Sequence, residues 1–253
     1  MGKTIIITSG PTNEQIDAVM KITNMSTGTL GAVIADAFIN STNDGDIDKI
    51  YYISPKLARK PRSSTNKIEC LTVESTQDLL DTLTNLLTSQ HIDLVVHSAA
   101  VGDYKAAYTI RAEDLIDEIW GAIQSGRVSG KNGLMAIFEN PRAVQNDDTK
   151  ISSYEPHLMT MMALTPKVIG SIKKISPDTK LVGFKLLEGV SREELFEVAD
   201  RLRVKNQADF IVANDLSKIG GGKHWAMIVG PDGVAAECNT KDEIAETIIR
   251  LTM

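Results

Sequence analysis

Short apolar runs that alternate with segments of helical periodicity constrain this chain more than any other feature. Strand-length runs rich in β-branched residues lie at 4–8, 47–53, 68–73 and 93–99. Between them are a helical segment at 32–39 and a leucine-rich one capped by Thr76. Strands separated by helices pair in parallel, with the helices covering the sheet. We therefore predict an α/β fold of Rossmann-like type, with a mostly parallel sheet and helices on both faces.

The second half of the chain continues the alternation and ends in a hairpin. Strands are expected at 158–164, 181–184 and 209–213, with a helix beginning at Pro166 as a first-turn residue. Ser191 and Thr240 each precede a glutamate by three residues, as in capping boxes. Gly230-Pro231-Asp232-Gly233 separates two further apolar runs and predicts a small C-terminal β-hairpin.

The middle of the chain breaks the pattern. A helix is expected at 113–124, followed by a glycine- and lysine-rich stretch at 125–133 and by polar loop residues. We predict a single domain, 1–253, with a mobile inserted flap at about 111–150 that acts as a lid or a dimer contact.

Composition narrows the function classes. The 253 residues carry a net charge of -6, which argues against a broad nucleic-acid surface. No apolar window approaches the ~20 residues of a membrane span, and no signal peptide is visible. The two cysteines, Cys70 and Cys238, form no CxxC motif and are expected as buried thiols. We expect a soluble cytoplasmic protein without a nucleic-acid or membrane partner.

Polar residues gather where the predicted strands end. They lie at 9–12, 99–104, 184–185 and 213–215. In a doubly wound sheet, ligands bind beyond the carboxyl ends of the strands. The same residues also suit ordinary turns, so the pattern indicates a site without proving one.

One small-residue loop precedes a helix. Residues 26–31, Ser-Thr-Gly-Thr-Leu-Gly, leave room for backbone N–H groups to approach an anion at a helix start, although plain helix capping explains them equally. The loop matches neither the P-loop motif nor the GxGxxG fingerprint.

Candidate charged partners are few. Arg201 and Lys205 share a helix face at i, i+4 spacing, and with Lys150 they can contact phosphate, the alternative being a solvated basic face. Asp103 follows a strand and can help to hold Mg²⁺, or simply cap a turn. The four histidines show no ligand spacing.

Taken in order, several motifs resemble the phosphopantothenate–cysteine ligase family over nearly the whole chain. The matching segments are Thr8–Thr12, Ile22–Gly28, Ala99–Tyr104, Lys150–Ser153, Pro166–Ile169, Val182–Phe184 and Arg201–Asp215. The resemblance implies that 4'-phosphopantothenate and L-cysteine are joined at the expense of a nucleoside triphosphate, with CTP and Mg²⁺ expected, in coenzyme A synthesis. It also implies a homodimer.

The resemblance further implies residue roles. Asn24 and Lys150 would be catalytic, Asn24 on the reacting acyl group, and Asn214 would bind substrate. The implied nucleotide-binding residues are Ser26, Thr27, Gly28, Ala99, Asp103, Pro166, Lys167, Val168, Ile169, Phe184, Arg201 and Lys205, with Asp103 also at the metal.

The chain departs from the family pattern in three places. Ser152 and Ser153 stand where lysines are usual in the family. Lys185 follows Phe184, where the bifunctional bacterial form has a small residue. The 111–148 stretch is longer than the corresponding stretch of that bacterial form. The decarboxylase domain fused to many members is absent, which predicts a stand-alone ligase.

Two other functions stay open on sequence grounds. An NAD(P)-dependent reductase would use a similar sheet, but it requires the glycine fingerprint and an acidic residue ending the second strand. A non-enzymatic nucleotide-binding regulator would bind the triphosphate without turnover.

Overall fold

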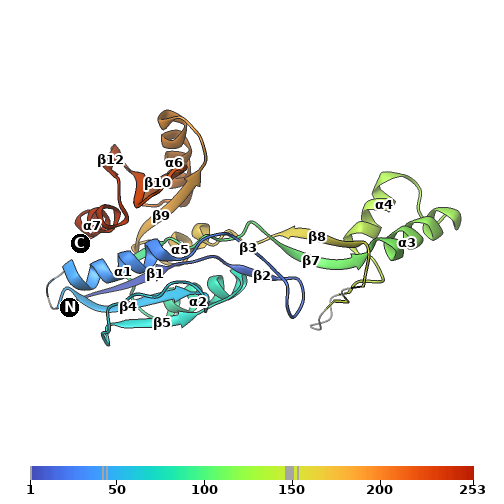
Figure 1. Cartoon of the computed structure of the whole chain (residues 1–253), viewed down its shortest axis with the longest axis horizontal. Helices are drawn as coiled ribbons and strands as arrows, with labels where there is room; N and C mark the ends of the chain where they lie inside the picture. The colour runs from blue at the N-terminus through green and yellow to red at the C-terminus, as the bar shows by residue number, and fades with distance from the viewer. Residues whose placement is uncertain (1, 42, 44, 146–150, 153) are drawn as a thin grey trace. The chain divides into compact units, whose positions relative to one another are not determined.

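The computed structural model describes residues 2–41, 43, 45–145, 151–152 and 154–253, and they form two compact units. The first unit comprises residues 1–12, 24–101 and 166–253. The second comprises residues 13–23 and 102–165. Figure 1 labels most of the helices and strands of both units.

An eight-stranded sheet forms the centre of the first unit, in the order β12-β11-β10-β9-β6-β1-β4-β5. The six neighbouring strands β5, β4, β1, β6, β9 and β10 are parallel. β11 pairs antiparallel with β10, and β12 pairs antiparallel with β11. The strands are β1 (Lys3–Thr8), β4 (Ile47–Ser54), β5 (Ile68–Thr72), β6 (Leu94–His97), β9 (Lys180–Leu187), β10 (Phe210–Gly220), β11 (Lys223–Gly230) and β12 (Gly233–Cys238). The predicted Rossmann-like fold and C-terminal hairpin are confirmed.

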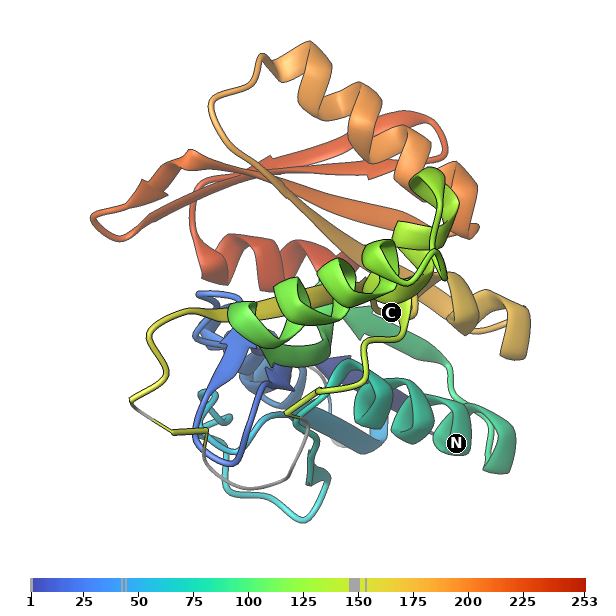
Figure 2. The same cartoon turned by 90° about the vertical axis from the view of Figure 1, so that its right-hand side faces the viewer.

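Helices cover both faces of this sheet because alternate strand residues are apolar on each side. Ile5 and Ile7 face α1 (Thr29–Ser41) and α7 (Lys241–Thr252), whereas Ile6 faces the opposite layer. That layer holds α2 (Thr76–Ser89), α5 (Ile169–Ile175) and α6 (Arg192–Asn206). Figure 2 shows α6 and α7 on opposite sides of the β10–β12 strands. Within the described residues, no helix combines the length and apolar character needed to cross a bilayer.

The second unit is built from two short β-ribbons and two helices. One ribbon pairs β2 (Asn13–Gln15) with β3 (Lys21–Thr23), and the other pairs β7 (Tyr104–Arg111) with β8 (Leu158–Leu164). The helices are α3 (Ala112–Gln124) and α4 (Gly130–Glu139). Tyr108, Ile110, Leu115, Ala122 and Ile137 form a hydrophobic cluster of the unit's own. The unit is therefore larger than the expected flap at 111–150.

Helix starts follow the sequence with two corrections. Ser191 and Thr240 cap α6 and α7 as predicted. Ser75, not Thr76, caps α2, because Asp78 closes a capping box on Ser75 while Thr76 is buried and donates to the Thr12 hydroxyl. The helix expected from Pro166 begins only at Ile169.

Three further expectations are corrected. The predicted loop 125–133 overlaps the start of α4 at Gly130. β10 continues past Asn214 and Asp215 to Gly220. Cys238 is buried as predicted, but Cys70 is exposed.

Candidate functional site

The order of the strands reverses between β1 and β6, and we call the region beyond the carboxyl ends of these two strands the crevice. The chain passes from β1 to β4 and β5 on one side, and then to β6, β9 and β10 on the other. Ligands of such sheets bind at this switch point, beyond the carboxyl ends of the strands. The loops that leave β1 and β6 are tied together there, since Ala100 N–H donates to the Gly10 carbonyl at 2.8 Å and Thr12 N–H to the Ala100 carbonyl at 3.2 Å.

Three glycines allow close backbone approach in this crevice. Gly10 and Gly28 have φ of 77° and 75°, and a Cβ on Gly28 would lie 3.3 Å from the Gly10 Cα. A Cβ on Gly31 would lie 2.4 Å from the Ser9 hydroxyl oxygen, which itself donates to the Gly28 carbonyl at 3.0 Å. Only glycine fits at such positions without a shift of its neighbours.

These glycines form a split version of the dinucleotide fingerprint. In GxGxxG the first glycine makes the tight turn, the second allows close backbone approach, and the third lets the helix pack on the strand. Here Gly10 is in the turn after β1, Gly28 lies against Gly10, and Gly31 lets α1 pack against Ser9. The sequence hides the pattern because residues 13–23 leave the first unit between Gly10 and Gly28. Gly10 and Gly31 lie in the predicted segments 9–12 and 26–31, but the sequence assigned neither of them a role of its own. The Gly28-x-x-Gly31 spacing before a helix was the available signal.

The start of α1 supplies donors beside the glycines. α1 begins at Thr29, and its first intrahelical bond runs from Ala32 N–H to the Gly28 carbonyl. First-turn N–H groups lack helical acceptors and lie at the positive end of the helix dipole. Together with Ser26 and Thr27, this loop suits an anionic group such as a phosphate.

Asn24 lies at the same crevice. Its side-chain Nδ2 donates to the Ala100 carbonyl at 2.9 Å, so the amide is tied to the loop that follows β6. The side chain is exposed, and the segment leads directly into Ser26–Gly28. The structure therefore brings together three predicted positions, Asn24, Gly28 and Ala99, although they are up to 75 residues apart in sequence.

A buried histidine supports this loop. His97 Nδ1 lies 2.9 Å from the Thr8 hydroxyl, and Ala99 N–H donates to that hydroxyl at 3.2 Å. Burial lowers the pKa of His97 to about 4, so the imidazole is neutral near pH 7. In a neutral ring one nitrogen donates and the other accepts, so the tautomer decides whether Nδ1 accepts the Thr8 proton or donates to the Thr8 oxygen. Thr8 and His97 thus position the Ala99–Ala100 backbone, a role that no motif in the sequence indicated.

Phe184 and Asn214 lie within the next two strands, in the carboxyl half of β9 and at the fifth residue of β10. Phe184 pairs in register with Val212, and Asn214 with Leu186, so both side chains belong to the sheet face that α1 covers. Asn214 is 5% exposed, and its Nδ2 has no hydrogen-bond partner among the described residues. A buried amide left without an acceptor is rare, and it suits a ligand that supplies one.

Several predicted residues lie elsewhere in the first unit. Arg201 forms an ion pair with Glu197 at 3.7 Å, and Lys205 is in the last turn of α6, which leads to the amino end of β10. No hydrogen bond or ion pair between described residues links either one to the glycine loop. Pro166, Lys167 and Val168 precede the short helix α5, and Ile169 begins it. Their nucleotide contacts remain predictions.

Asp103 belongs to the second unit. The Asp103 carbonyl accepts a hydrogen bond from Thr165 N–H at 3.0 Å, and its carboxylate is exposed. Within the described part of the chain, no three His, Cys, Asp or Glu side chains cluster as a metal site. Lys150, predicted as catalytic, lies outside the described residues.

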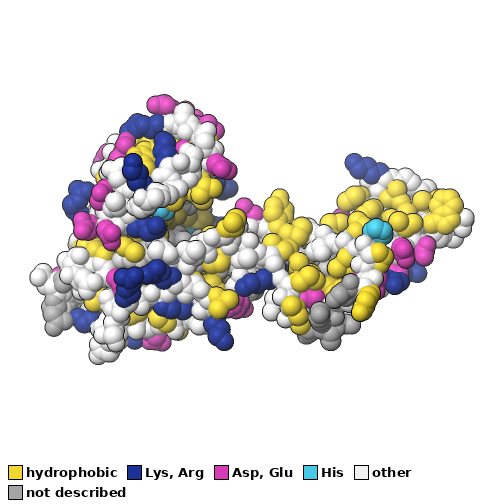
Figure 3. All heavy atoms as spheres, viewed as in Figure 1, with side chains coloured by type: hydrophobic (Ala, Val, Ile, Leu, Met, Phe, Trp, Pro, Cys, Tyr) yellow, Lys and Arg dark blue, Asp and Glu magenta, His cyan; other side chains and the backbone are white. Residues whose placement is uncertain are grey.

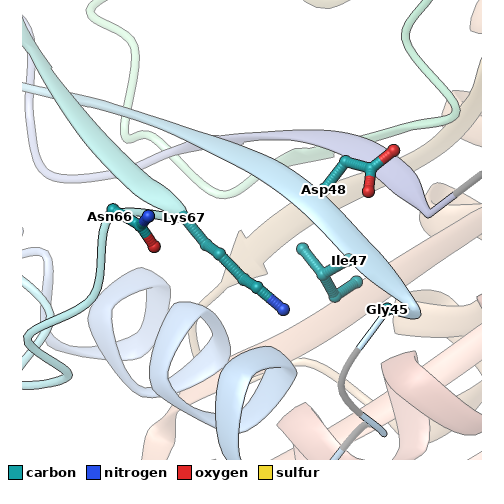
Figure 4. Close-up of a pocket in the computed structure, with 5 residues that line it drawn as sticks. All are labelled: Gly45, Ile47, Asp48, Asn66 and Lys67. Atoms are coloured by element: carbon teal, nitrogen blue, oxygen red, sulfur yellow. The ribbon is translucent and has the colours of Figure 1, made fainter.

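Two hollows lie in the first unit, one away from this crevice and one that begins beside it at Thr29. One, of about 310 Å³, is at the amino ends of β4 and β5 (Figure 4) and is lined by Gly45, Ile47, Asp48, Asn66 and Lys67. It is at the sheet edge opposite the crevice. The other, of about 730 Å³, runs along the outer side of α1 from Thr29 to Ser41. Neither contains a residue predicted for the site.

Comparison with known proteins shows which family the chain belongs to. The family described as DNA/pantothenate metabolism flavoprotein C-terminal domain matches residues 1–114 and 136–253. The chain belongs to this family. All the ordered motifs that suggest a phosphopantothenate–cysteine ligase lie within the matched residues. None of them lies in the unmatched segment 115–135.

Relatives and solved structures agree with this membership. The chain is 29% identical to the coenzyme A biosynthesis bifunctional protein CoaBC of Thermococcus kodakarensis and 24% identical to that of Methanocaldococcus jannaschii, in each case over 98% of this chain and 50% of the relative. It therefore spans about half the length of these curated relatives. A solved DNA/pantothenate metabolism flavoprotein from Streptococcus pneumoniae is 31% identical, with a TM-score of 0.79 over 99% of this chain and 97% of that one. The C-terminal domain of a CoaBC protein shares the fold at 22% identity and a TM-score of 0.64.

Proposed function

We propose that the chain is a ligase that joins 4'-phosphopantothenate to L-cysteine with CTP, through an acyl-cytidylate, in coenzyme A biosynthesis. The observation that carries the proposal is the crevice itself, where Asn24 and the split glycine cluster meet in a member of this family. Two further findings support it: the names of the bifunctional relatives, and a structure of Cab2 in complex with phosphopantothenate-cysteine that shares the fold at 15% identity.

The chemistry explains why such a crevice is needed. A carboxylate has no usable leaving group, so its oxygen attacks the α-phosphorus of CTP and expels pyrophosphate. The cysteine amine then attacks the acyl carbon and expels CMP. Both steps build negative charge, which oriented donors stabilise in a site of low dielectric constant. The N–H groups at the start of α1 would hold the phosphates, and the Asn24 amide would donate to the acyl oxygen.

The remaining assignments are part of the proposal. Ala99 and Phe184 would line the nucleotide pocket, and Asn214 would bind the substrate, from which its buried amide would gain the missing acceptor. Lys150, Arg201 and Lys205 stay the predicted sources of positive charge, although Lys205 lies where α6 leads to the amino end of β10, at the edge of the sheet opposite the crevice. The described residues build no cage for Mg²⁺, so the ion would be carried by the nucleotide phosphates, with Asp103 as one protein ligand. We also expect a cytoplasmic homodimer.

The reductase alternative lacks one of its requirements. A dinucleotide site needs a carboxylate at the end of the second strand to hold the ribose. Here β4 ends in Ser54, and the Lys60 amine donates to the Ser54 hydroxyl at 2.6 Å. A cation therefore lies where the reductase would have an acid.

A steady-state assay with CTP, ATP and NADPH separates the candidate functions. The ligase predicts pyrophosphate release that depends on phosphopantothenate, with kcat/KM for CTP above that for ATP. Lys150→Ala should abolish most turnover without changing the thermal midpoint. NADPH oxidation would instead support a reductase, and triphosphate binding without turnover a regulator.

A further inference from the structure

Two buried polar atoms on one face of the main sheet have no hydrogen-bond partner among the described residues. They are Nδ2 of Asn214 on β10 and Nδ1 of His224 on β11. The two residues are 5% and 9% exposed, and bulk water does not reach the two atoms. Because nearly all buried polar groups in proteins are paired, two unpaired ones in one region indicate a ligand that supplies the missing partners.

The pairing of β10 with β11 places these two side chains close together. Asn214 pairs with Ala226, and His224 is two residues from Ala226 along β11, so both side chains lie on the face where Ala226 and Val212 pack. In a regular antiparallel pair, such diagonal neighbours are about 7–8 Å apart. One small group can therefore contact both side chains.

A bulge in β10 follows Asn214 directly. Between Asn214 and Ile219, five steps along β10 oppose two steps along β11. Asp215 fixes the bulge from a buried position, because its Oδ1 accepts hydrogen bonds from Gly189 N–H at 2.9 Å, Ser217 N–H at 3.0 Å and the Ser217 hydroxyl at 2.8 Å. Bulges redirect side chains and are common next to active sites. The backbone around the unpaired atoms is therefore held in a defined shape.

The start of α7 lies beside His224. The His224 N–H donates to the Asn239 carbonyl at 2.7 Å, and α7 begins two residues later at Lys241. The positive end of the α7 dipole is therefore close to this histidine. Lys241 adds a positive charge and forms no ion pair within the described part of the chain. These surroundings favour a negatively charged group.

Asn214 and His224 can both donate hydrogen bonds to such a group. Burial, with a smaller effect of the Lys241 charge, lowers the pKa of His224 to about 4, so the ring is neutral near pH 7. A neutral imidazole carries one N–H, which is on Nδ1 in one of its two tautomers, and the amide nitrogen of Asn214 only donates. The pair can therefore offer two N–H groups to one acceptor.

The outer surface does not select an anion in this region. Over the part of the first unit that contains α6, α7 and β12, basic and acidic side chains are interspersed (Figure 3). Selection of an anionic group would therefore depend on the individual donors beneath the surface and on the start of α7.

We infer that Asn214 and His224 bind the carboxylate of L-cysteine. The inference rests on the proposed ligase function, which assigns the phosphates to the start of α1 and the acyl oxygen to Asn24, and leaves this carboxylate without a partner. A carboxylate has a single charge, which two neutral donors near Lys241 can satisfy. The 4'-phosphate carries up to about two negative charges near pH 7 and would leave more charge uncompensated in a buried position. Anchoring the carboxylate would orient the cysteine amine for attack.

Steady-state kinetics of the full chain with L-cysteine and with cysteamine, which lacks the carboxylate, tests this inference. His224→Ala should raise KM for L-cysteine at least tenfold and leave KM for CTP and phosphopantothenate unchanged. It should lower kcat/KM much less for cysteamine than for L-cysteine. His224→Asn keeps an N–H near the position of Nδ1 and should recover most of the affinity for L-cysteine. His91→Ala is the control, because His91 is exposed and precedes the amino end of β6.

The first half-reaction separates this inference from the proposed function. Without cysteine, the wild type should release a burst of pyrophosphate that depends on phosphopantothenate, and His224→Ala should give the same burst. No burst from the wild type would refute the ligase itself.

A normal burst with an unchanged KM for L-cysteine in folded His224→Ala would overturn the assignment. An increase confined to KM for CTP or phosphopantothenate, or an equal loss for both nucleophiles, would also overturn it. If His224→Ala does not fold, His224→Phe keeps a ring of similar size without the nitrogen atoms and is measured in the same way.

Discussion

Asn24 is the residue on which the proposed chemistry depends most. Its Nδ2 donates to the Ala100 carbonyl, and Asn24→Asp would replace that donor by a carboxylate facing a carbonyl oxygen. On the functional interpretation, the same change also places a negative charge beside a phosphate or developing oxyanion, so turnover should fall by roughly 10²-fold or more. Pyrophosphate release and amide formation are the measurements.

Asn132→Asp is a matched control, because Asn132 is exposed on α4 and has no predicted role in the site. If folded Asn24→Asp keeps more than about a third of wild-type turnover, a loss of under ~1 kcal/mol, then Asn24 is structural.

Gly31 tests the split glycine cluster. In Gly31→Ala the new methyl group would lie 2.4 Å from the Ser9 hydroxyl oxygen and 2.8 Å from that of Ser98. We expect this overpacking to lower the free energy of unfolding by about 1–3 kcal/mol and to reduce CTP affinity. Urea titration of Gly121→Ala provides the contrast: its methyl would meet nothing within 4 Å on α3, so it should gain about 0.5–1 kcal/mol. Similar effects of both changes would refute the close approach.

His97 should make the protein less stable in acid. Its folded pKa is about 4, below the unfolded value near 6.5, so the unfolded state binds more protons in that interval. Stability is therefore complete above pH 6.5 and is lost as the pH falls toward 4, by about 2 kcal/mol from this residue at pH 4.5.

Urea unfolding at pH 7 and pH 4.5 measures this loss. It should be smaller in His97→Gln and unchanged in His91→Gln, since His91 is exposed. A titration by nuclear magnetic resonance that put the pKa of His97 above 6 would show that the ring is not held neutral by burial.

At the scale of elements, the two units differ in the size of their cores. Five buried residues form the described cluster of the second unit, whereas the sheet of the first unit is packed on both faces by much larger clusters. Low apolar burial makes local opening easier. Amides of α3 and α4 should therefore exchange with solvent hydrogen faster than those of β6, with and without ligands. Protection equal to that of the Leu94 strand would contradict this.

The elements that the sequence predicted well are those with strong periodicity. The apolar runs of β1, β4 and β6 and the capped helices α6 and α7 follow from local pattern alone. The β2–β3 ribbon was not predicted, because three-residue strands such as Asn13–Gln15 carry too few residues for a period. α4 was read as loop because Gly130 and Gly133 lower helix propensity, whereas packing of Ile137 stabilises it.

Part of the site could not be predicted for a similar reason. Asn24, Gly28 and Ala99 were found through ordered motifs, but Gly10 and Gly31 join them only because the chain leaves the first unit between them. His97 and Thr8 act through burial and a hydrogen bond across two strands, and neither leaves a signal in a single sequence.

For the whole molecule, the proposed function rests on one chemical step: a carboxylate is activated by nucleotidyl transfer in the β1–β6 crevice. The fold and family membership support this claim, and the reaction itself can be followed atom by atom. If the carboxylate oxygen attacks the α-phosphorus, that oxygen leaves later with CMP when the cysteine amine attacks. An acyl phosphate route would instead send it to inorganic phosphate and release CDP.

The most direct test uses phosphopantothenate labelled with oxygen-18 in its carboxylate, with CTP, Mg²⁺ and cysteine, and mass spectrometry of the products. Nucleotidyl transfer predicts one labelled oxygen in CMP, unlabelled pyrophosphate, and an amide product formed in equal amount. Label in inorganic phosphate, or no label in the nucleotide while the amide forms, would contradict it.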